Sequence, residues 1–339
     1  MQKLKVALIE GDGIGPEVSN ATLKVLEALK STFNLNFEIQ KVDAGDRCLE
    51  RKGRALPEES LDVIKGSKAI LKGPVGNTAM DVVVRLRQMF DLYANIRPVK
   101  NLPKVPSLKP NIDFIIVREN TEDLYKGYEF NIQGGAIALR IITEKSCRRI
   151  AEYAFKLAEK RKGKIVAVHK ANVLRLTDGL FVKVCKEVAS NYPHIEYSEM
   201  LVDAMAMNLI RNPENYDVIL TTNVFGDILS DEAAQLVGGL GLAPSANLGD
   251  DKALFEPVHG AAPDIAGKGI ANPLAMILSS KMMLDWFFSI TGEENYGRAG
   301  EVLVKSVIKS LEEGFTTLDL GGDKKTMEVA DFIIRELKV

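Results

Sequence analysis

The sequence predicts an α/β protein of two domains, built on mostly parallel sheets. Short apolar runs alternate with amphipathic segments, beginning with Leu4–Ile9 and a helix from about Pro16, a pattern typical of parallel strands covered by helices. A chain of 339 residues is too long for one compact core, which indicates two domains. The first strand leads into Gly11-x-Gly13-x-Gly15. This spacing is neither GxGxxG nor a P-loop, so a conventional Rossmann fold is not predicted.

Apolar periodicity and turn residues predict the remaining elements. Strands are expected at 36–42, 68–72, 113–117, 164–169 and 217–222, and helices at 17–31, 57–66, 144–161, after 177, across 227–231, and at 274–288, 296–313 and 326–337. A hairpin is expected at 128–143, around a Gly-Gly pair. A lone hairpin is marginal in water, so this one needs a partner surface. The Gly- and Pro-rich stretch 244–273 and the stretch 316–326 are expected to be ordered loops.

Composition excludes several classes of protein. The 44 Lys and Arg nearly balance the 46 Asp and Glu, so nothing attracts nucleic acid or an anionic membrane non-specifically. The three cysteines are scattered and lack CxxC spacing, which argues against a disulfide framework or thiolate metal site and fits a reducing, cytoplasmic location. No apolar run approaches the roughly 20 residues that span a bilayer, and the N-terminus is typical of a strand rather than a signal peptide.

Two carboxylates, Asp227 and Asp231, lie four residues apart on the helix that follows the strand at 217–222. This spacing places them on one helical face, where like charges repel. Either Asp227 caps the helix and Asp231 points into water, or the pair binds a divalent cation. The spacing alone leaves both interpretations open, but a positive charge is expected nearby.

A second helical face is apolar until it ends in a guanidinium. Met80, Val83, Val84 and Arg87 are spaced i, i+3, i+4 and i+7, and Arg85 lies off this face.

Arg97 and Arg118, like Arg87, lie near the ends of predicted elements. Guanidinium groups bind carboxylates bidentately, so the three arginines could together hold a small polycarboxylate. Lys170 comes directly after a strand, where it is either a solvated charge or a general base. Asp203 lies among apolar neighbours, where a carboxylate needs a cation or a hydrogen bond.

Six segments together resemble the β-decarboxylating dehydrogenases, the family of isopropylmalate, isocitrate and homoisocitrate dehydrogenases. They are GDGIGPEV, LRQMFDLYANIRPVK, IVRENTEDLYKG, HKANVLRLTDGLF, NVFGDILSDEAAQLVGGLGLAPSANLGD and FEPVHGAAPDIAGKGIANP. The resemblance implies this family's two-domain α/β fold, with a large cofactor-binding domain at 1–98 and 249–339. It also implies a small domain at 99–248 that carries dimerisation, metal and substrate functions, with the hairpin near 128–143 clasping a second copy. Dimer or tetramer is left open.

The resemblance also implies a role for each matching residue. Arg87, Arg97 and Arg118 would grip the substrate carboxylates, and Val83 and Val84 would line the substrate pocket. Asp227 and Asp231 would bind Mg²⁺ or Mn²⁺ with Asp203 of a second copy. Lys170, also lent by that copy, would be the general base, and Tyr125 would be the acid that protonates the enolate. NAD would be held by Ile14, His259, Gly260, Ala262, Asp264, Ile265 and Asn272.

The choice of cofactor and substrate depends on a few of these positions. An acid at Asp264 suits the adenosine ribose hydroxyls of NAD and would repel the 2′-phosphate of NADP. Family members that use isocitrate usually place Ser and Asn where Asp81 and Val83 stand, and some homoisocitrate enzymes carry Arg where Val84 stands. The apolar face therefore favours 3-isopropylmalate, with isocitrate and homoisocitrate as alternatives. A non-catalytic subunit of the same fold is disfavoured, because none of the lysine, tyrosine or metal-binding acids is replaced.

Overall fold

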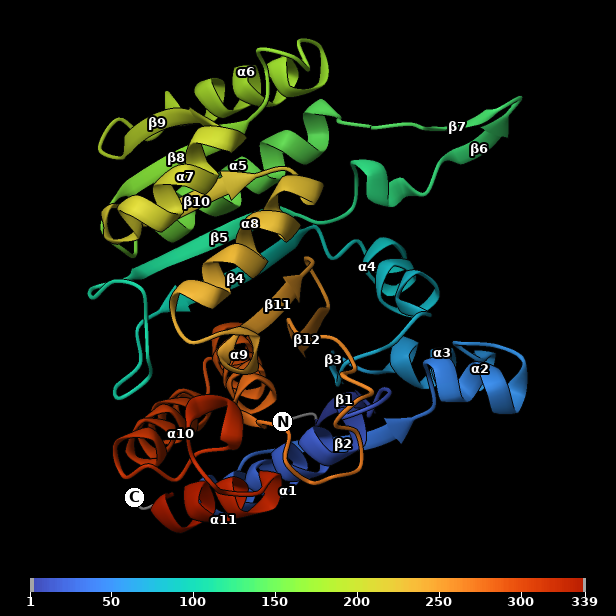
Figure 1. Cartoon of the computed structure of the whole chain (residues 1–339), viewed down its shortest axis with the longest axis vertical. Coiled ribbons are helices and arrows are strands. Elements are labelled where there is room, and N and C mark those ends of the chain that lie inside the picture. The colour runs from blue at the N-terminus through green and yellow to red at the C-terminus, as the bar shows by residue number, and fades with distance from the viewer. Residues whose placement is uncertain (1–2, 338–339) are drawn as a thin grey trace.

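A computed structural model describes residues 3–337, and one ten-stranded sheet runs through it in the order β2-β1-β3-β12-β11-β4-β5-β10-β8-β9 (Figure 1). These strands are β1 (Leu4–Ile9), β2 (Phe37–Val42), β3 (Ala69–Lys72), β4 (Ala94–Lys100), β5 (Asp113–Glu119), β8 (Lys164–His169), β9 (Glu196–Leu201), β10 (Val218–Thr221), β11 (Pro244–Leu248) and β12 (Ala253–Pro257). The hairpin strands β6 (Glu129–Ile132) and β7 (Gly135–Ala138) form a separate two-stranded sheet.

The predicted mostly parallel arrangement is confirmed. Parallel pairing joins β2, β1, β3 and β12 on one side of the sheet, and β5, β10, β8 and β9 on the other. Antiparallel pairs of β11 with β12 and β4, and of β4 with β5, connect the two groups. The carboxyl ends of β5, β10 and β8 therefore meet at one edge, the usual position of ligand sites in such sheets.

Helices cover both groups of strands. They are α1 (Gly15–Phe33), α2 (Asp46–Lys52), α3 (Glu58–Gly66), α4 (Arg85–Met89), α5 (Glu144–Ala158), α6 (Thr177–Ala189), α7 (Val202–Arg211), α8 (Asn223–Leu236), α9 (Leu274–Thr291), α10 (Glu294–Glu312) and α11 (Thr326–Glu336). A π-helix, Met80–Val84, immediately precedes α4, and short 3₁₀ turns occur at Leu124–Lys126, Pro213–Asn215, Leu240–Leu242 and Leu318–Leu320.

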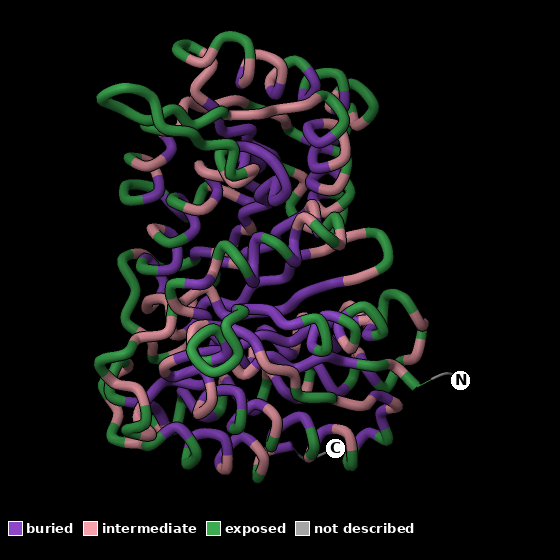
Figure 2. The backbone as a smooth tube through the Cα atoms, turned by 90° about the vertical axis from the view of Figure 1, so that its right-hand side faces the viewer, coloured by how far each residue is buried: buried purple, intermediate pink, exposed green. Residues whose placement is uncertain are grey.

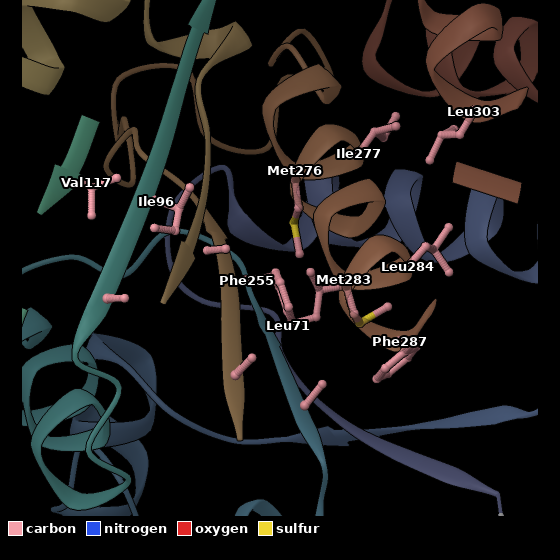
Figure 3. Packing of buried hydrophobic residues seen from close by; sticks show 14 of the residues in the cluster. Leu71, Ile96, Val117, Phe255, Met276, Ile277, Met283, Leu284, Phe287 and Leu303 are labelled. Carbon is pink, nitrogen blue, oxygen red and sulfur yellow. The ribbon is translucent and has the colours of Figure 1, made fainter. Parts of the chain in front are cut away.

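The apolar helix α9 lies at the centre of the largest core. Figure 3 shows Met276, Met283 and Phe287 of α9 directed toward Leu71 of β3 and Phe255 of β12. This helix is long and apolar enough to cross a membrane, with a mean hydropathy of 1.2, but half of it is buried inside the protein. Its contacts with β3, β11 and β12 identify α9 as a core helix. Burial of its apolar side chains contributes to the stability of the fold.

Part of the stretch expected to be loop is sheet, which corrects the sequence prediction. Residues 244–248 and 253–257 form β11 and β12, which pair with each other in the middle of the sheet. Their prolines, Pro244 and Pro257, stand at strand ends, where a missing amide donor is tolerated. The sequence prediction also lacks strands β4 and β9 and helices α2 and α7.

The hairpin projects away from the rest of the chain (Figure 1). Every residue of β6 and β7 is exposed, and exposed residues are green in Figure 2. The apolar side chains of Tyr128, Phe130, Ile132 and Leu139 are between 46% and 55% exposed. The division into domains at 98/99 and 248/249 stays a prediction, because the sheet is continuous across both positions.

Candidate active site

Two of the three predicted arginines converge on the acid pair of α8. Arg97, from β4, donates to Asp227 at 3.1 Å and to Asp231 at 3.3 Å, and Arg118, from the end of β5, also pairs with Asp227. The positive charge that the acid pair requires is thus supplied by guanidinium groups within the same chain. The capping interpretation is wrong, because the N-cap of α8 is Thr222 and Asp227 lies one turn further into the helix.

Arg118 is completely buried and is fixed along its whole length. Its Nε and one terminal nitrogen donate to Asn223 Oδ1, at 2.9 and 2.6 Å. Its aliphatic stem crosses the backbone of α8 at Gly226, where an added Cβ would lie 2.7 Å from Arg118 Cβ. Gly226 is therefore required by this close approach, since any side chain there would displace the arginine. Burial and the neighbouring Arg97 lower the pKa of Arg118 to about 10, so it keeps its charge at neutral pH.

The two carboxylates have opposite electrostatic environments. Burial alone would raise the pKa of Asp227, but the guanidinium groups of Arg118 and Arg97 overcome this effect and lower it to about 2. For Asp231, burial outweighs the attraction of Arg97 and raises the pKa. Asp227 is therefore a firmly ionised group at any physiological pH.

Tyr125 completes this cluster from the turn after β5. Its hydroxyl donates to Asp227, and the Arg118 guanidinium lies 5.0 Å from the centre of its ring. Burial raises the pKa of the Tyr125 phenol, which keeps it protonated and able to donate a proton. Its main-chain carbonyl accepts a hydrogen bond from Gln88 of α4 at 2.7 Å, a contact that links this turn to the arginine-bearing helix.

Arg87 is buried and bound to a carboxylate that no feature of the sequence singles out. It donates to Glu256 of β12 at 2.9 Å, and Lys72 of β3 binds the same carboxylate at 2.9 Å. Burial opposes ionisation of Glu256, but the two cations hold its pKa well below the usual range. Within residues 3–337, Arg87 Nε has no hydrogen-bond partner although it is buried. A ligand acceptor would satisfy this donor.

The helical face before Arg87 differs from the predicted register. Residues 80–84 form a π-helix, whose wider turn rotates side chains relative to an α-helix. Met80 is 48% exposed, whereas Val83 and Val84 are buried, so the expected single face that included Met80 is wrong. Arg85 points away toward Glu58, at 4.0 Å.

Lys170 and Asp203 lie apart from this cluster and bind each other. The Lys170 Nζ is 2.5 Å from the Asp203 carboxylate, and both side chains are partly exposed. The Lys170 ammonium lowers the pKa of Asp203. In the part of the chain that the structure describes, no three His, Cys, Asp or Glu side chains form a metal-binding group. A single chain therefore does not unite Asp203 with Asp227 and Asp231.

The α8 acids fit a hard divalent cation as a partial site. Both present carboxylate oxygens, the ligand type that Mg²⁺ and Mn²⁺ prefer, and their side chains remain 35% and 54% exposed. Two protein ligands are too few for an all-protein cage, so water, substrate or a further carboxylate must supply the rest.

A separate cavity of about 590 Å³ brings together six of the seven residues predicted to bind NAD: Ile14, His259, Gly260, Ala262, Ile265 and Asn272. Asp264 is exposed and is not part of its lining. Two loops form one wall, because the Ile14 amide donates to the Ala261 carbonyl at 2.8 Å and Gly13 adopts a positive φ of 54° directly against that residue.

His259 gives this cavity an unused hydrogen-bonding atom. Its Nδ1 lies 3.1 Å from the Gly260 carbonyl, which fixes Nδ1 as the protonated nitrogen and leaves Nε2 as an acceptor. Within the described residues, the buried Nε2 has no partner. Burial lowers the pKa of His259, so the neutral ring can accept from an amino or hydroxyl group of a nucleoside.

Sequence reasoning missed several residues around both sites. Leu240, Gly241, Leu318 and Asp319 also line the cavity, and Asp319 accepts from Asn272 at 2.9 Å. Leu318 and Asp319 belong to the stretch 316–326, which showed no signal beyond that of a loop. Asn95, Asn223 and Ser230 position the arginines. Asn223 belongs to the quoted segment NVFGD, but only the fold reveals its role.

Asp12, in the first glycine-rich loop, is structural. Its buried carboxylate accepts from the amides of Asp46 and Arg47, at 2.8 and 3.1 Å, at the start of α2. A carboxylate at a helix N-terminus satisfies otherwise free amides. The Asp12 carboxylate therefore stabilises the start of α2.

Known proteins resemble the chain over almost its whole length. Residues 5–333 match the family described as isocitrate/isopropylmalate dehydrogenase. The 3-isopropylmalate dehydrogenase of Methanothermobacter thermautotrophicus is 53% identical over the full length of both chains, and that of Saccharolobus solfataricus is 52% identical over 98% of each. A crystal structure of isocitrate dehydrogenase from Methylococcus capsulatus has a TM-score of 0.92 at 40% identity, covering 99% of this chain and 100% of the other.

Proposed function

Because this chain belongs to the isocitrate/isopropylmalate dehydrogenase family, we propose that it catalyses the metal-dependent oxidative decarboxylation of 3-isopropylmalate. The products are 4-methyl-2-oxopentanoate, CO2 and NADH, a step of leucine biosynthesis. The observation that carries the proposal is the convergence of Arg97, Arg118, Tyr125 and Asp227 at the carboxyl end of β5. This convergence provides cations for a dicarboxylate, a proton donor and a metal-binding carboxylate in one place.

The arginines bind and orient the substrate. Arg97 and Arg118 are held rigidly by Asn95 and Asn223, so they lose little conformational freedom when a carboxylate binds. Arg87 adds a buried Nε donor with no partner among the described residues. Fixing both carboxylates of a malate skeleton leaves its C2 hydroxyl and hydrogen in a defined orientation.

Mg²⁺ or Mn²⁺ held by Asp227 and Asp231 would polarise the substrate hydroxyl and then the ketone, and NAD in the 590 Å³ cavity would accept the hydride. The residues of the chain move the protons. Lys170 takes the proton of the C2 hydroxyl as hydride leaves C2. After CO2 departs, Tyr125, kept protonated by its raised pKa, returns a proton to the carbon that carried the lost carboxylate.

A second copy of the chain is needed for this sequence of steps. Lys170 and Asp203 pair with each other away from Asp227, so we propose that they serve the site of the partner in a homodimer. Exposed apolar side chains support such an assembly: Phe130 and Ile132 on the hairpin, Met207 and Ile210 on α7, and Ile228 on α8 are at least 50% exposed. Patches of this kind mark interfaces between chains. The three free, buried cysteines are consistent with the cytoplasmic location that we propose.

The choice of NAD and of 3-isopropylmalate rests on single positions. The acid Asp264, which adjoins the cavity-lining Ile265 in sequence, would disfavour the 2′-phosphate of NADP. Val84 presents an apolar surface where a third substrate carboxylate would need a cation, and burying an isopropyl group there contributes roughly 1.5–3 kcal/mol. This is enough for preference but not for exclusion, so isocitrate and homoisocitrate remain the alternatives.

The test compares kcat/KM for 3-isopropylmalate, isocitrate and homoisocitrate, each with NAD and with NADP, in the presence of Mg²⁺. We expect 3-isopropylmalate with NAD to be preferred by about ten-fold or more, given the value of a buried branched side chain. A large excess for either tricarboxylate would replace the substrate assignment. Absence of NADH formation with all three would favour a non-catalytic subunit.

A further inference from the structure

Arg140 makes more hydrogen bonds than any arginine assigned to the substrate, yet it lies outside the site described above. It follows β7 at the base of the hairpin, and its side chain is 13% exposed. It donates to both oxygens of Asp123, at 2.6 and 3.2 Å, and also pairs with Asp178. It donates in addition to Thr177 Oγ1 at 3.2 Å and Thr222 Oγ1 at 2.9 Å. One guanidinium thus joins four segments that are distant in sequence.

Asp123, the first partner, controls the position of Tyr125. Its backbone has φ 69° and ψ −147°, a conformation that side-chain-bearing residues adopt only when their surroundings enforce it. The enforcing contacts are the bonds from Arg140, the bonds from the Leu124 and Val224 amides to the Asp123 carboxylate, and the bond from the Asp123 amide to Ile141. Tyr125 follows two residues later, so its direction depends on this fixed turn.

Asp178, the second partner, controls the position of Lys170. It lies in the first turn of α6, is fully buried, and accepts a hydrogen bond from the Lys170 main-chain amide at 2.6 Å. Without Arg140, Asp123 and Asp178 would be two buried carboxylates lacking their shared cation, an arrangement that is strongly disfavoured.

Thr222, the third contact, is the N-cap residue of α8, the helix that carries Asp227. The Arg140 guanidinium also lies 5.1 Å from the centre of the Phe225 ring on that helix. The same side chain therefore contacts residues that adjoin or hydrogen-bond the segments of Tyr125, Lys170 and Asp227.

We propose that Arg140 is a positioning residue that holds Tyr125 and Lys170 in fixed relation to each other. This inference rests on the proposed function for its catalytic meaning. If Lys170 serves the site of the partner while Tyr125 serves its own, Arg140 mechanically links the two active sites of a dimer, because one guanidinium holds a group from each.

The experiment compares Arg140→Gln and the conservative Arg140→Lys with a matched control, Arg161→Gln. Arg161 is 20% exposed and also bridges two carboxylates, Asp113 and Asp217, each at 2.7 Å. These acids lie at the amino ends of β5 and β10, the ends opposite Arg118 and α8. The control therefore removes a similar ion-pair bridge without touching the Arg140 network.

The first readout is hydrogen–deuterium exchange of the unliganded protein, which needs no activity. We expect Arg140→Gln to speed exchange about ten-fold or more in both 123–127 and 170–178, because local opening follows the lost contacts. Arg161→Gln should leave both segments within about three-fold of the wild type. Unchanged exchange in either segment of Arg140→Gln, or an equal effect of Arg161→Gln, would overturn the proposal. If Arg140→Gln does not fold, Arg140→Lys is judged by the same comparison.

The second readout is steady-state kinetics. We expect kcat of Arg140→Gln to fall about 30-fold or more while KM for substrate and NAD changes less than about three-fold, since misplaced proton-transfer groups slow chemistry more than binding. Arg140→Lys should recover part of kcat. A wild type that turns over none of the three substrates, together with the predicted exchange pattern, would refute the proposed function and leave the positioning network standing. An active wild type with a normal kcat in Arg140→Gln would refute the positioning role of Arg140 and leave the proposed function standing.

Discussion

The cavity beside His259 and the arginine-rich site around Asp227 are built in different ways. The cavity is walled by loops of one chain around His259 and Asn272, with an unused acceptor already in place. The arginine-rich site has its cations, Asp227 and Tyr125 in contact, but Lys170 and Asp203 are bound to each other elsewhere. One chain should therefore bind the cofactor by itself, whereas the proposed mechanism requires two.

The substitution Asp227→Asn should have the largest effect, and it should affect the arginine-rich site while leaving the cavity unchanged. This change removes the proposed metal ligand and the counter-charge of Arg118, so metal-dependent turnover should fall by about three orders of magnitude or more. NAD affinity, measured by isothermal titration, should stay within about two-fold because the cavity does not include this residue. Size-exclusion chromatography checks that the dimer persists, and near-normal activity would refute the role of Asp227.

A smaller change should act on the cavity alone. The double substitution Asp264→Lys with Ile265→Tyr should lower kcat/KM for NAD about ten-fold or more and raise that for NADP, because a cation replaces the acid that is proposed to bind the ribose hydroxyls. KM for 3-isopropylmalate is the internal control and should change little. A wild type that already prefers NADP would show that Asp264 does not act as proposed.

The sequence predicted the two regions to different depths. Periodicity located most helices and strands. The repulsion between Asp227 and Asp231 predicted a positive charge nearby, which Arg97 supplies. The register of residues 80–84 could not be predicted, because a π-helix depends on tertiary packing rather than on the apolar pattern. No sequence pattern singles out Arg140, because its four hydrogen-bonding partners come together only in the folded chain.

The weakest expected effect is on stability in acid. The folded pKa of Asp227, about 2, is below its ordinary value of 3.8, so its ion pairs stabilise the fold above about pH 4. This stabilisation is lost as the pH falls from 3.8 toward 2. Because the side chain is 35% exposed, we discount the contribution to about 1 kcal/mol.

Urea unfolding in EDTA at pH 5 and pH 3 measures this contribution. The wild type should lose about 0.5 kcal/mol more than Asp227→Asn between the two pH values, because at pH 3, above the folded pKa of about 2, only about half of the contribution is lost. Equal losses would mean that the Arg97 and Arg118 pairs with Asp227 do not stabilise the folded chain.

The division of the catalytic site between two copies is tested most directly by complementation. Tyr125→Phe and Lys170→Met chains, each inactive as a homodimer, are coexpressed with different tags, and the mixed dimer is isolated. If Lys170 acts in the site of the partner, one site of the mixed dimer carries both defects and the other carries none. The account therefore predicts about half of the wild-type activity per dimer. A mixed dimer as inactive as its parents would mean that Lys170 acts in its own chain, and would contradict the account.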